Sequence, residues 1–155
     1  MLLNGINHVA TLTSDTDRLH TFYREVFEAQ VVSDMTEAPE GAGVRLSIID
    51  IGGGTMLNVF QIAGNSEAER QVPMFGRGRI DHAGLLAKDL ASFEKIRDRL
   101  MERGAADEFV TDFGAELSVF FRDPDGLEGE VVVENPDAIP GVHNPPGTPA
   151  VRYVR

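Results

Sequence analysis

INHVATLTSDTDRLHTFY (residues 6–23) and IDHAGLLAKDLASFEKIR (residues 80–97) align without a gap, and His8 falls on His82 at an offset of 74 positions. A second match pairs VRLSII (residues 44–49) with AELSVF (residues 115–120) at an offset of 71 positions. The identities are sparse in each match. Because the two matches occur in the same order at nearly the same offset, the sequence predicts an internal duplication.

Both copies show the same order of predicted elements. In the first copy, a strand at about residues 4–12 precedes a helix that Ser14 or Asp15 caps and that ends near residue 28. The second copy begins with a strand over residues 79–87 and a helix from Asp89 to about Arg103, which Gly104 ends. Three further strands follow each helix, over residues 30–35, 43–51 and 55–63, and over residues 105–113, 115–122 and 127–134.

This order predicts an α+β fold built from two tandem βαβββ modules. We expect the modules to form an open, cup-shaped eight-stranded sheet with the helices on the outside. The modules span residues 1–64 and 79–134, and residues 65–78 link them. Residues 135–155 are rich in Pro and Gly, which predicts an extended C-terminal arm.

Composition narrows the classes of function. The chain has 155 residues, of which 42% are apolar, and no run of apolar residues approaches the roughly 18 that a transmembrane helix needs. It contains no cysteine, so disulfides and thiolate metal sites are excluded. A net charge of -11 opposes binding to nucleic acid. With no signal peptide visible, we expect a cytoplasmic protein whose partner is a small molecule, neither nucleic acid nor membrane.

Alternation along the strands places a group of polar residues on one face. If the helices cover the apolar face that carries Leu57 and Val131, the opposite face presents His8, His82, Asn58 and Glu130. A carboxylate buried there needs a cation or a hydrogen-bond donor. Two imidazoles and a carboxylate together suit a divalent metal ion.

The duplicated βαβββ order, the histidine in the first strand of each copy, and FRDPDGLEGEVVVE (residues 121–134) resemble the vicinal oxygen chelate superfamily. This superfamily includes glyoxalase I, extradiol dioxygenases and bleomycin-resistance proteins. The resemblance covers about residues 4–134, and its most specific part is the Asp-Pro-Asp-Gly turn with an acid four positions after its Gly, at Glu130. It implies a homodimer and one divalent ion (Fe, Mn, Co, Ni or Zn) held by His8, His82 and Glu130. Asn58 would be a fourth ligand or a contact to the substrate.

The resemblance implies a metal-dependent, glyoxalase-like enzyme with lyase or isomerase chemistry on a small substrate that bears vicinal oxygens. Glu130 would act in it as a ligand or as a displaceable catalytic base. Glyoxalase I uses paired glutamates at its metal, and Asn58 removes one of them, since an amide cannot accept a proton. Ordinary lactoylglutathione lyase activity is therefore not expected. Methylmalonyl-CoA epimerase carries a catalytic glutamate on a strand where this chain offers only Asp50.

Two alternatives stay open. The first is an Fe(II) oxidoreductase that resembles the extradiol dioxygenases, which also need acid and base side chains near the metal. This chain has only four such residues to spare, His20, His143, Tyr23 and Tyr153. The second is a metal-free protein that sequesters a small molecule, as bleomycin-resistance proteins do, and the retained ligand set counts against it.

Four more residues carry expectations. His20 is expected on the surface of the first helix and Tyr23 in its core. Arg77 and Arg79, in the linker, are either surface charges or contacts for an anionic substrate.

Overall fold

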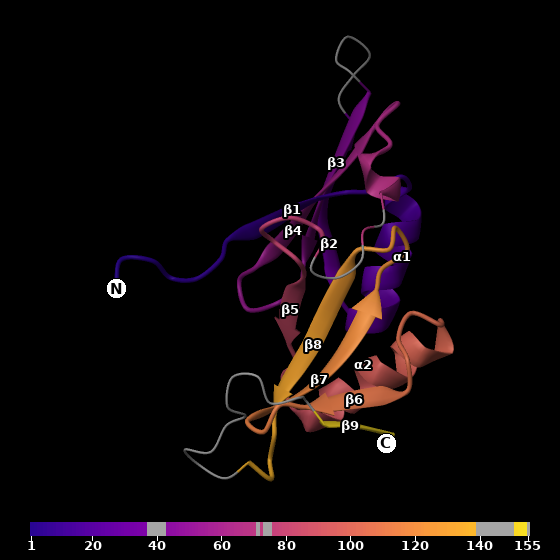
Figure 1. Ribbon diagram of the computed structural model, residues 1–155. Helices are drawn as coiled ribbons and strands as arrows, with labels where there is room; N and C mark the ends of the chain where they lie inside the picture. The colour runs from indigo at the N-terminus through magenta and orange to yellow at the C-terminus, as the bar shows by residue number, and fades with distance from the viewer. Residues whose placement is uncertain (37–42, 71, 73–75, 139–150, 155) are drawn as a thin grey trace. The chain divides into compact units, whose positions relative to one another are not determined.

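Each half of the chain folds in the order strand, helix and three strands, as Figure 1 shows for a computed structural model. The structure describes residues 1–36, 43–70, 72, 76–138 and 151–154. One unit comprises Met1–Gln71 with Pro124–Gly126, and the other comprises Val72–Asp123 with Leu127–Arg155. The first change of unit, after Gln71, falls within the predicted linker.

The first unit holds a four-stranded sheet in the order β1-β4-β3-β2. Strand β1 is parallel to β4, and the other neighbours are antiparallel. A short 3₁₀ turn, Glu67–Glu69, follows the last strand. The elements are β1 (His8–Leu12), α1 (Thr16–Phe27), β2 (Gln30–Thr36), β3 (Val44–Asp50) and β4 (Met56–Ile62).

The second unit repeats this topology in the order β5-β8-β7-β6. The α+β fold of two tandem βαβββ modules is thus confirmed, and the two sheets are not closed. The elements are β5 (Ala83–Leu86), α2 (Leu90–Glu102), β6 (Phe109–Asp112), β7 (Glu116–Arg122) and β8 (Glu128–Glu134).

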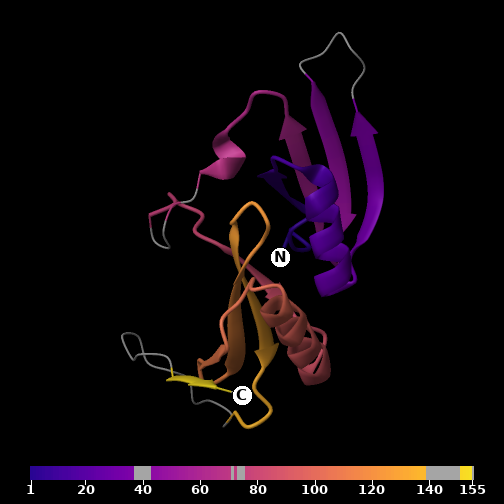
Figure 2. The same cartoon turned by 90° about the vertical axis from the view of Figure 1, so that its right-hand side faces the viewer.

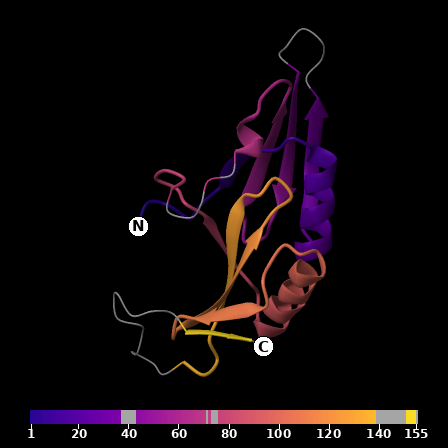
Figure 3. The same ribbon diagram turned by 45° about the vertical axis from the view of Figure 1, so that its right-hand side comes forward.

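A further strand, β9 (Val151–Val154), lies in the C-terminal arm and pairs antiparallel with β6 (Figure 3). The sequence analysis predicted no strand in the arm, because a four-residue strand beside a Pro- and Gly-rich segment carries little local signal. Pairing with β6 stabilises this strand, because the outer edge of a sheet offers unpaired backbone N–H and C=O groups.

Both helices begin where the sequence predicted. The Asp15 side chain accepts a hydrogen bond from the Arg18 backbone N–H at 3.0 Å, and Asp89 accepts one from the Ser92 N–H at 2.7 Å. These N-caps satisfy backbone donors that the first helical turn leaves without a partner. Gly104 follows α2 with a positive φ of 63°, as its predicted place at the end of the helix requires.

Each helix covers one face of its own sheet. In the first unit α1 packs on that face (Figure 2), where Leu57 and Val59 are buried. In the second unit α2 packs against β8, and both Phe93 and Val131 are almost fully buried. Leu57 and Val131 therefore lie on the helix-covered faces, as predicted. Because side chains alternate along a strand, Asn58 and Glu130 lie on the opposite faces.

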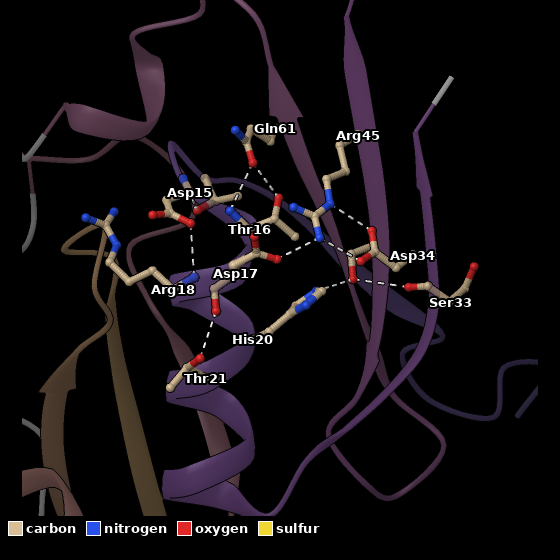
Figure 4. A network of polar contacts seen from close by, with 12 residues as sticks. Asp15, Thr16, Asp17, Arg18, His20, Thr21, Ser33, Asp34, Arg45 and Gln61 are labelled. Atoms are coloured by element: carbon tan, nitrogen blue, oxygen red, sulfur yellow. Dashed lines mark hydrogen bonds and ion pairs between the residues drawn. The ribbon is translucent and has the colours of Figure 1, made fainter. Parts of the chain in front are cut away.

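A network of polar contacts lies between α1 and its sheet (Figure 4). The His20 Nε2 atom is 2.6 Å from the Ser47 hydroxyl, which donates to the Ser33 carbonyl at 3.1 Å. His20 is only 7% exposed, so the prediction of a surface residue is wrong. The helical pattern did not reveal that Ser47, on β3, offers the imidazole a partner inside the protein. Tyr23, at 5% exposure, is in the core as predicted.

No helix in the part of the chain that the structure describes is both long and apolar enough to cross a membrane.

Candidate metal and substrate site

The second unit brings His82 and Glu130 together. Glu130 lies in the middle of β8, directly opposite Gly84 of the parallel strand β5, and His82 lies two residues before Gly84. The Nε2 atom of His82 is 3.4 Å from Oε2 of Glu130. The two side chains are 26% and 15% exposed, so they are partly shielded from solvent yet accessible.

Neighbouring side chains hold both groups in place. The Nδ1 atom of His82 is 2.9 Å from Oδ2 of Asp81, and the ring contacts Phe120 edge to face with ring centres 5.7 Å apart. The Ser118 hydroxyl donates to Oε1 of Glu130 at 2.5 Å. Sequence analysis asked for a cation or a donor beside this carboxylate, and Ser118 is such a donor.

The facing atoms of the pair need a positive charge between them. A carboxylate can only accept hydrogen bonds, so the contact with Asp81 favours the tautomer of His82 that carries its proton on Nδ1 and a lone pair on Nε2. A lone pair that faces a carboxylate oxygen is repelled unless a proton or a metal ion lies between them. The 3.4 Å separation is longer than the roughly 2.7–2.9 Å of a charge-assisted hydrogen bond.

The first unit repeats this arrangement with different chemistry. Asn58 of β4 lies opposite Ala10 of the parallel strand β1, and His8 lies two residues before Ala10. The Nδ1 atom of His8 is 2.8 Å from Oδ1 of Asn7, and His8 is exposed. The pairing registers therefore make Asn58 and Glu130 equivalent positions of the two modules. This equivalence agrees with the resemblance, which implied Asn58 as a fourth ligand or a substrate contact.

A nearby ion pair accounts for a second acid of β8. Glu128 and Arg77 are 2.5 Å apart, and their side chains are 12% and 13% exposed. Arg77 also lies 3.6 Å from Asp81 through its other terminal nitrogen. Arg77 is therefore part of the polar structure of the second unit, which the sequence did not reveal. Glu128 thus has a cationic partner within the second unit.

The four residues considered as extra acids and bases have separate locations. His20 and Tyr23 belong to α1 and are buried between it and the sheet, on the face opposite Asn58. His143 lies outside the described residues, and Tyr153 lies in β9. Neither His20 nor Tyr23 can therefore serve a site on the open face of its sheet.

Within the described residues, no group of three or more His, Cys, Asp or Glu side chains could hold a metal ion. The structure therefore shows the His82–Glu130 pair within the second unit and His8 within the first, each by itself. The three-residue ligand set and the role of Asn58 stay predictions.

A pocket of about 700 Å³ opens in the second unit, and neither His82 nor Glu130 is among its lining residues. Phe120, whose ring contacts His82, and Glu128 both line it. This volume falls within the roughly 300–1,000 Å³ that is typical of small-molecule sites. The other lining residues are Gly104, Ala105, Ala106, Asp107, Thr111, Phe113, Phe121 and Arg122.

Comparison with solved structures finds the same fold in several proteins. A glyoxylase/bleomycin resistance protein/dioxygenase domain from Frankia sp. EAN1pec is 19% identical with a TM-score of 0.68, covering 87% of this chain and 95% of that one. The fosfomycin resistance protein FosX from Listeria monocytogenes, in complex with Mn(II) and 1S,2S-dihydroxypropylphosphonic acid, is 15% identical with a TM-score of 0.64, covering 84% and 92%. A lactoylglutathione lyase from Agrobacterium tumefaciens is 21% identical with a TM-score of 0.56, covering 86% and 96%.

At these identities the likeness shows the fold alone. No curated protein sequence matches the chain. The family model of the Glyoxalase/Bleomycin resistance protein/Dioxygenase superfamily matches residues 5–131, which include most of both modules and each predicted ligand. The chain belongs to this superfamily.

Proposed function

We propose that the protein is a metal-dependent enzyme that performs lyase or isomerase chemistry on a small molecule with vicinal oxygens. The observation that carries the proposal is the His82–Glu130 pair, whose facing atoms lie 3.4 Å apart. Membership of the superfamily supports it, because FosX of this fold was crystallised with Mn(II). Ordinary lactoylglutathione lyase activity is not proposed, since Asn58 stands where a second carboxylate would be needed.

The residues present fit a divalent ion. Two ligand atoms that each lie about 2.0–2.2 Å from one ion are roughly 3–3.5 Å apart, which agrees with the His82–Glu130 separation. Neutral imidazole and carboxylate are suitable ligands for Fe, Mn, Co, Ni or Zn. His82 and Glu130 would hold the ion with His8, and Asn58 would be a fourth ligand or a substrate contact.

The proposed chemistry divides between the ion and Glu130. When bound, the ion supplies Lewis-acid polarisation of two neighbouring substrate oxygens. Glu130 then has two roles open to it, as a permanent ligand or as the base whose Oε2 accepts a substrate proton. Ser118 holds Oε1 by its hydrogen bond and thereby orients Oε2 toward His82.

The pocket that Phe120 lines indicates the kind of substrate. Its phenylalanine side chains suit an apolar portion, while Thr111 and Arg122 offer hydrogen-bond donors at its wall. Phe120 both lines this pocket and contacts the ring of His82, so we propose that the substrate binds here with its polar end toward His82. We propose a small molecule with an apolar portion and a pair of neighbouring oxygens.

Metal analysis tests the ligand set. Protein purified without chelator should contain about one first-row metal ion per chain. His82→Ala and Glu130→Ala should lose the ion. Glu134→Ala should keep it, because Glu134 belongs to the same strand but is exposed. Full metal content in either ligand variant would overturn the assignment of that ligand.

The same preparations separate the alternatives. Oxygen uptake with catechols after loading with Fe(II) would indicate the dioxygenase-like alternative, against which the buried positions of His20 and Tyr23 already count. Wild-type protein that binds no metal but retains small molecules with high affinity would indicate the sequestering alternative. Turnover of a substrate without oxygen uptake, abolished by chelator, is the result expected here.

Two further properties belong to the proposal. We propose a homodimer, by resemblance to the superfamily, and sedimentation analysis would test it. We also propose a cytoplasmic location, which suits a chain without cysteine. Cell fractionation would test that location.

A further inference from the structure

We infer that Asn7 and Asp81 are positioning residues, each of which holds the following histidine so that Nε2 is the nitrogen that binds the ion. The inference rests on the proposed metal site. It concerns two residues to which neither the internal repeat nor the family resemblance assigned a role.

Equivalent hydrogen bonds in the two modules carry the inference. Oδ1 of Asn7 lies 2.8 Å from Nδ1 of His8, and Oδ2 of Asp81 lies 2.9 Å from Nδ1 of His82. Asn7 and Asp81 are at equivalent positions of the duplication, so the same contact occurs twice. In both cases the acceptor oxygen requires the proton on Nδ1, which leaves the lone pair on Nε2.

This contact is the kind that orients histidine ligands in metal proteins. A ligand histidine usually donates its second ring N–H to a carboxylate or carbonyl, which fixes both tautomer and ring orientation. The preceding residue can do this here because its side-chain oxygen lies within hydrogen-bond distance of Nδ1 in both modules. The hydrogen bond thus fixes the orientation of the ring and the nitrogen that is free to bind the ion.

The two positioning residues differ in charge. Asp81 is a carboxylate that stabilises the positive charge an imidazole gains when Nε2 donates its lone pair to a cation, whereas the amide of Asn7 offers only a dipole. Arg77 lies 3.6 Å from Oδ2 of Asp81, and its other nitrogen is bound to Glu128. Arg77 therefore holds the Asp81 carboxylate in place only by its charge, at 3.6 Å. We expect His82 to be the more strongly binding of the two histidines.

The tautomers can be measured in the metal-free protein. Long-range ¹H–¹⁵N spectra, recorded above the usual titration range of histidine, should show the Nδ1–H tautomer for His8 and His82. In Asp81→Ala the share of the Nε2–H tautomer of His82 should rise, while His8 should stay unchanged. A wild-type His82 that already carries its proton on Nε2 would overturn the inference, whatever metal the protein binds.

Metal affinity tests the consequence for binding. In competition with a chromophoric chelator for Co(II), Asp81→Ala should bind about 10- to 100-fold more weakly than wild type. Asp81→Asn, which keeps an acceptor oxygen but loses the charge, should bind with an intermediate affinity and restore the Co(II) absorption spectrum of wild type. Asn7→Ala should cost less than Asp81→Ala. Asp137→Ala, which removes an exposed carboxylate, should change nothing.

The outcomes separate the two proposals. A wild-type protein that binds no Co(II) would overturn the proposed function, while the spectra would still decide the tautomers. A wild-type protein that binds Co(II), with Asp81→Ala equal to it in affinity and spectrum, would overturn the positioning role alone. Thermal unfolding of each variant shows that a loss of affinity does not come from a loss of fold.

Discussion

At the scale of the residue, His20 couples the stability of the first unit to pH. Burial beneath α1 lowers the pKa of His20 from its ordinary value of 6.5. The carboxylates of Asp34 and Asp17 oppose this decrease, and the cations of Arg45 and Arg24 add to it. The folded protein therefore favours a neutral His20 that keeps its contact with Ser47.

This lowered pKa predicts a loss of stability in mild acid. The unfolded chain takes up a proton at His20 as the pH falls through about 6.5, whereas the folded chain resists it. The contribution is thus fully present above that pH and is lost below it. Urea unfolding at pH values on either side of 6.5 should show a steeper decline for wild type than for His20→Gln. Equal slopes for the two proteins would contradict the prediction.

The aspartates of the same network act in a different pH range. Arg45 donates to Asp34 at 2.9 and 2.7 Å and to Asp17 at 2.7 Å, and these contacts lower the pKa of both carboxyl groups below 3.8. Their contribution to stability is present above the ordinary carboxyl pKa and lost only as the pH falls below it. A decline between neutral pH and pH 5 therefore reports on His20 and not on these carboxylates.

At the scale of the element, the pairing of β7 with β8 depends on one glycine. Gly129 lies directly opposite Phe121, whose buried ring occupies the space where a side chain at position 129 would begin. Gly129→Ala should lower the free energy of unfolding by about 1–3 kcal/mol, because the added Cβ forces the Phe121 ring out of its buried position. Urea unfolding measures this loss.

A second substitution distinguishes this collision from a general effect of alanine in a strand. In a Phe121→Leu background the same Gly129→Ala change should cost less, since the smaller side chain leaves room. Gly84→Ala is the matched control: it alters a glycine in β5, where an added Cβ would meet only Oε2 of Glu130 at 3.8 Å. An equal loss at both glycines would contradict the collision.

The elements were the part of the fold that sequence could predict best. Helical spacing of apolar residues and the caps Asp15 and Asp89 located both helices, because these signals are local. Strand alternation put Leu57 and Val131 under the helices for the same reason. Strand β9 escaped prediction, since its existence depends on an edge of β6 that is distant in sequence.

At the scale of the whole molecule, duplication was the signal that led to the candidate site. A single strand histidine carries little information, but His8 and His82 at equivalent positions indicated Asn58 and Glu130, and strand register bears out their equivalence. The polar contacts that hold the candidate site in place were not predicted. Ser118 lies on another strand, and Arg77 reaches Glu128 across 51 positions of sequence, so no local pattern reveals either contact.

The turn between β7 and β8 also makes contacts with residues distant in sequence, which no local pattern reveals. Sequence analysis used this turn to locate Glu130, yet its tip, Pro124–Gly126, belongs to the first unit. The Asp125 carboxylate accepts hydrogen bonds from the Thr13 hydroxyl at 2.5 Å, from the Ser14 hydroxyl at 2.8 Å and from the Ser14 N–H at 3.1 Å. It also pairs with Arg18 at 2.7 Å, and its side chain is 3% exposed.

Asp125→Ala should therefore lower the free energy of unfolding by about 2–4 kcal/mol, because it removes a buried carboxylate and leaves its donors without that acceptor. Half-exposed Arg18 can turn to water, so most of the loss should come from Thr13 and Ser14. Urea unfolding of Asp125→Ala and of the exposed control Asp137→Ala measures the difference, and the control should stay within about 0.5 kcal/mol of wild type. Equal free energies of unfolding for the two variants would contradict this prediction.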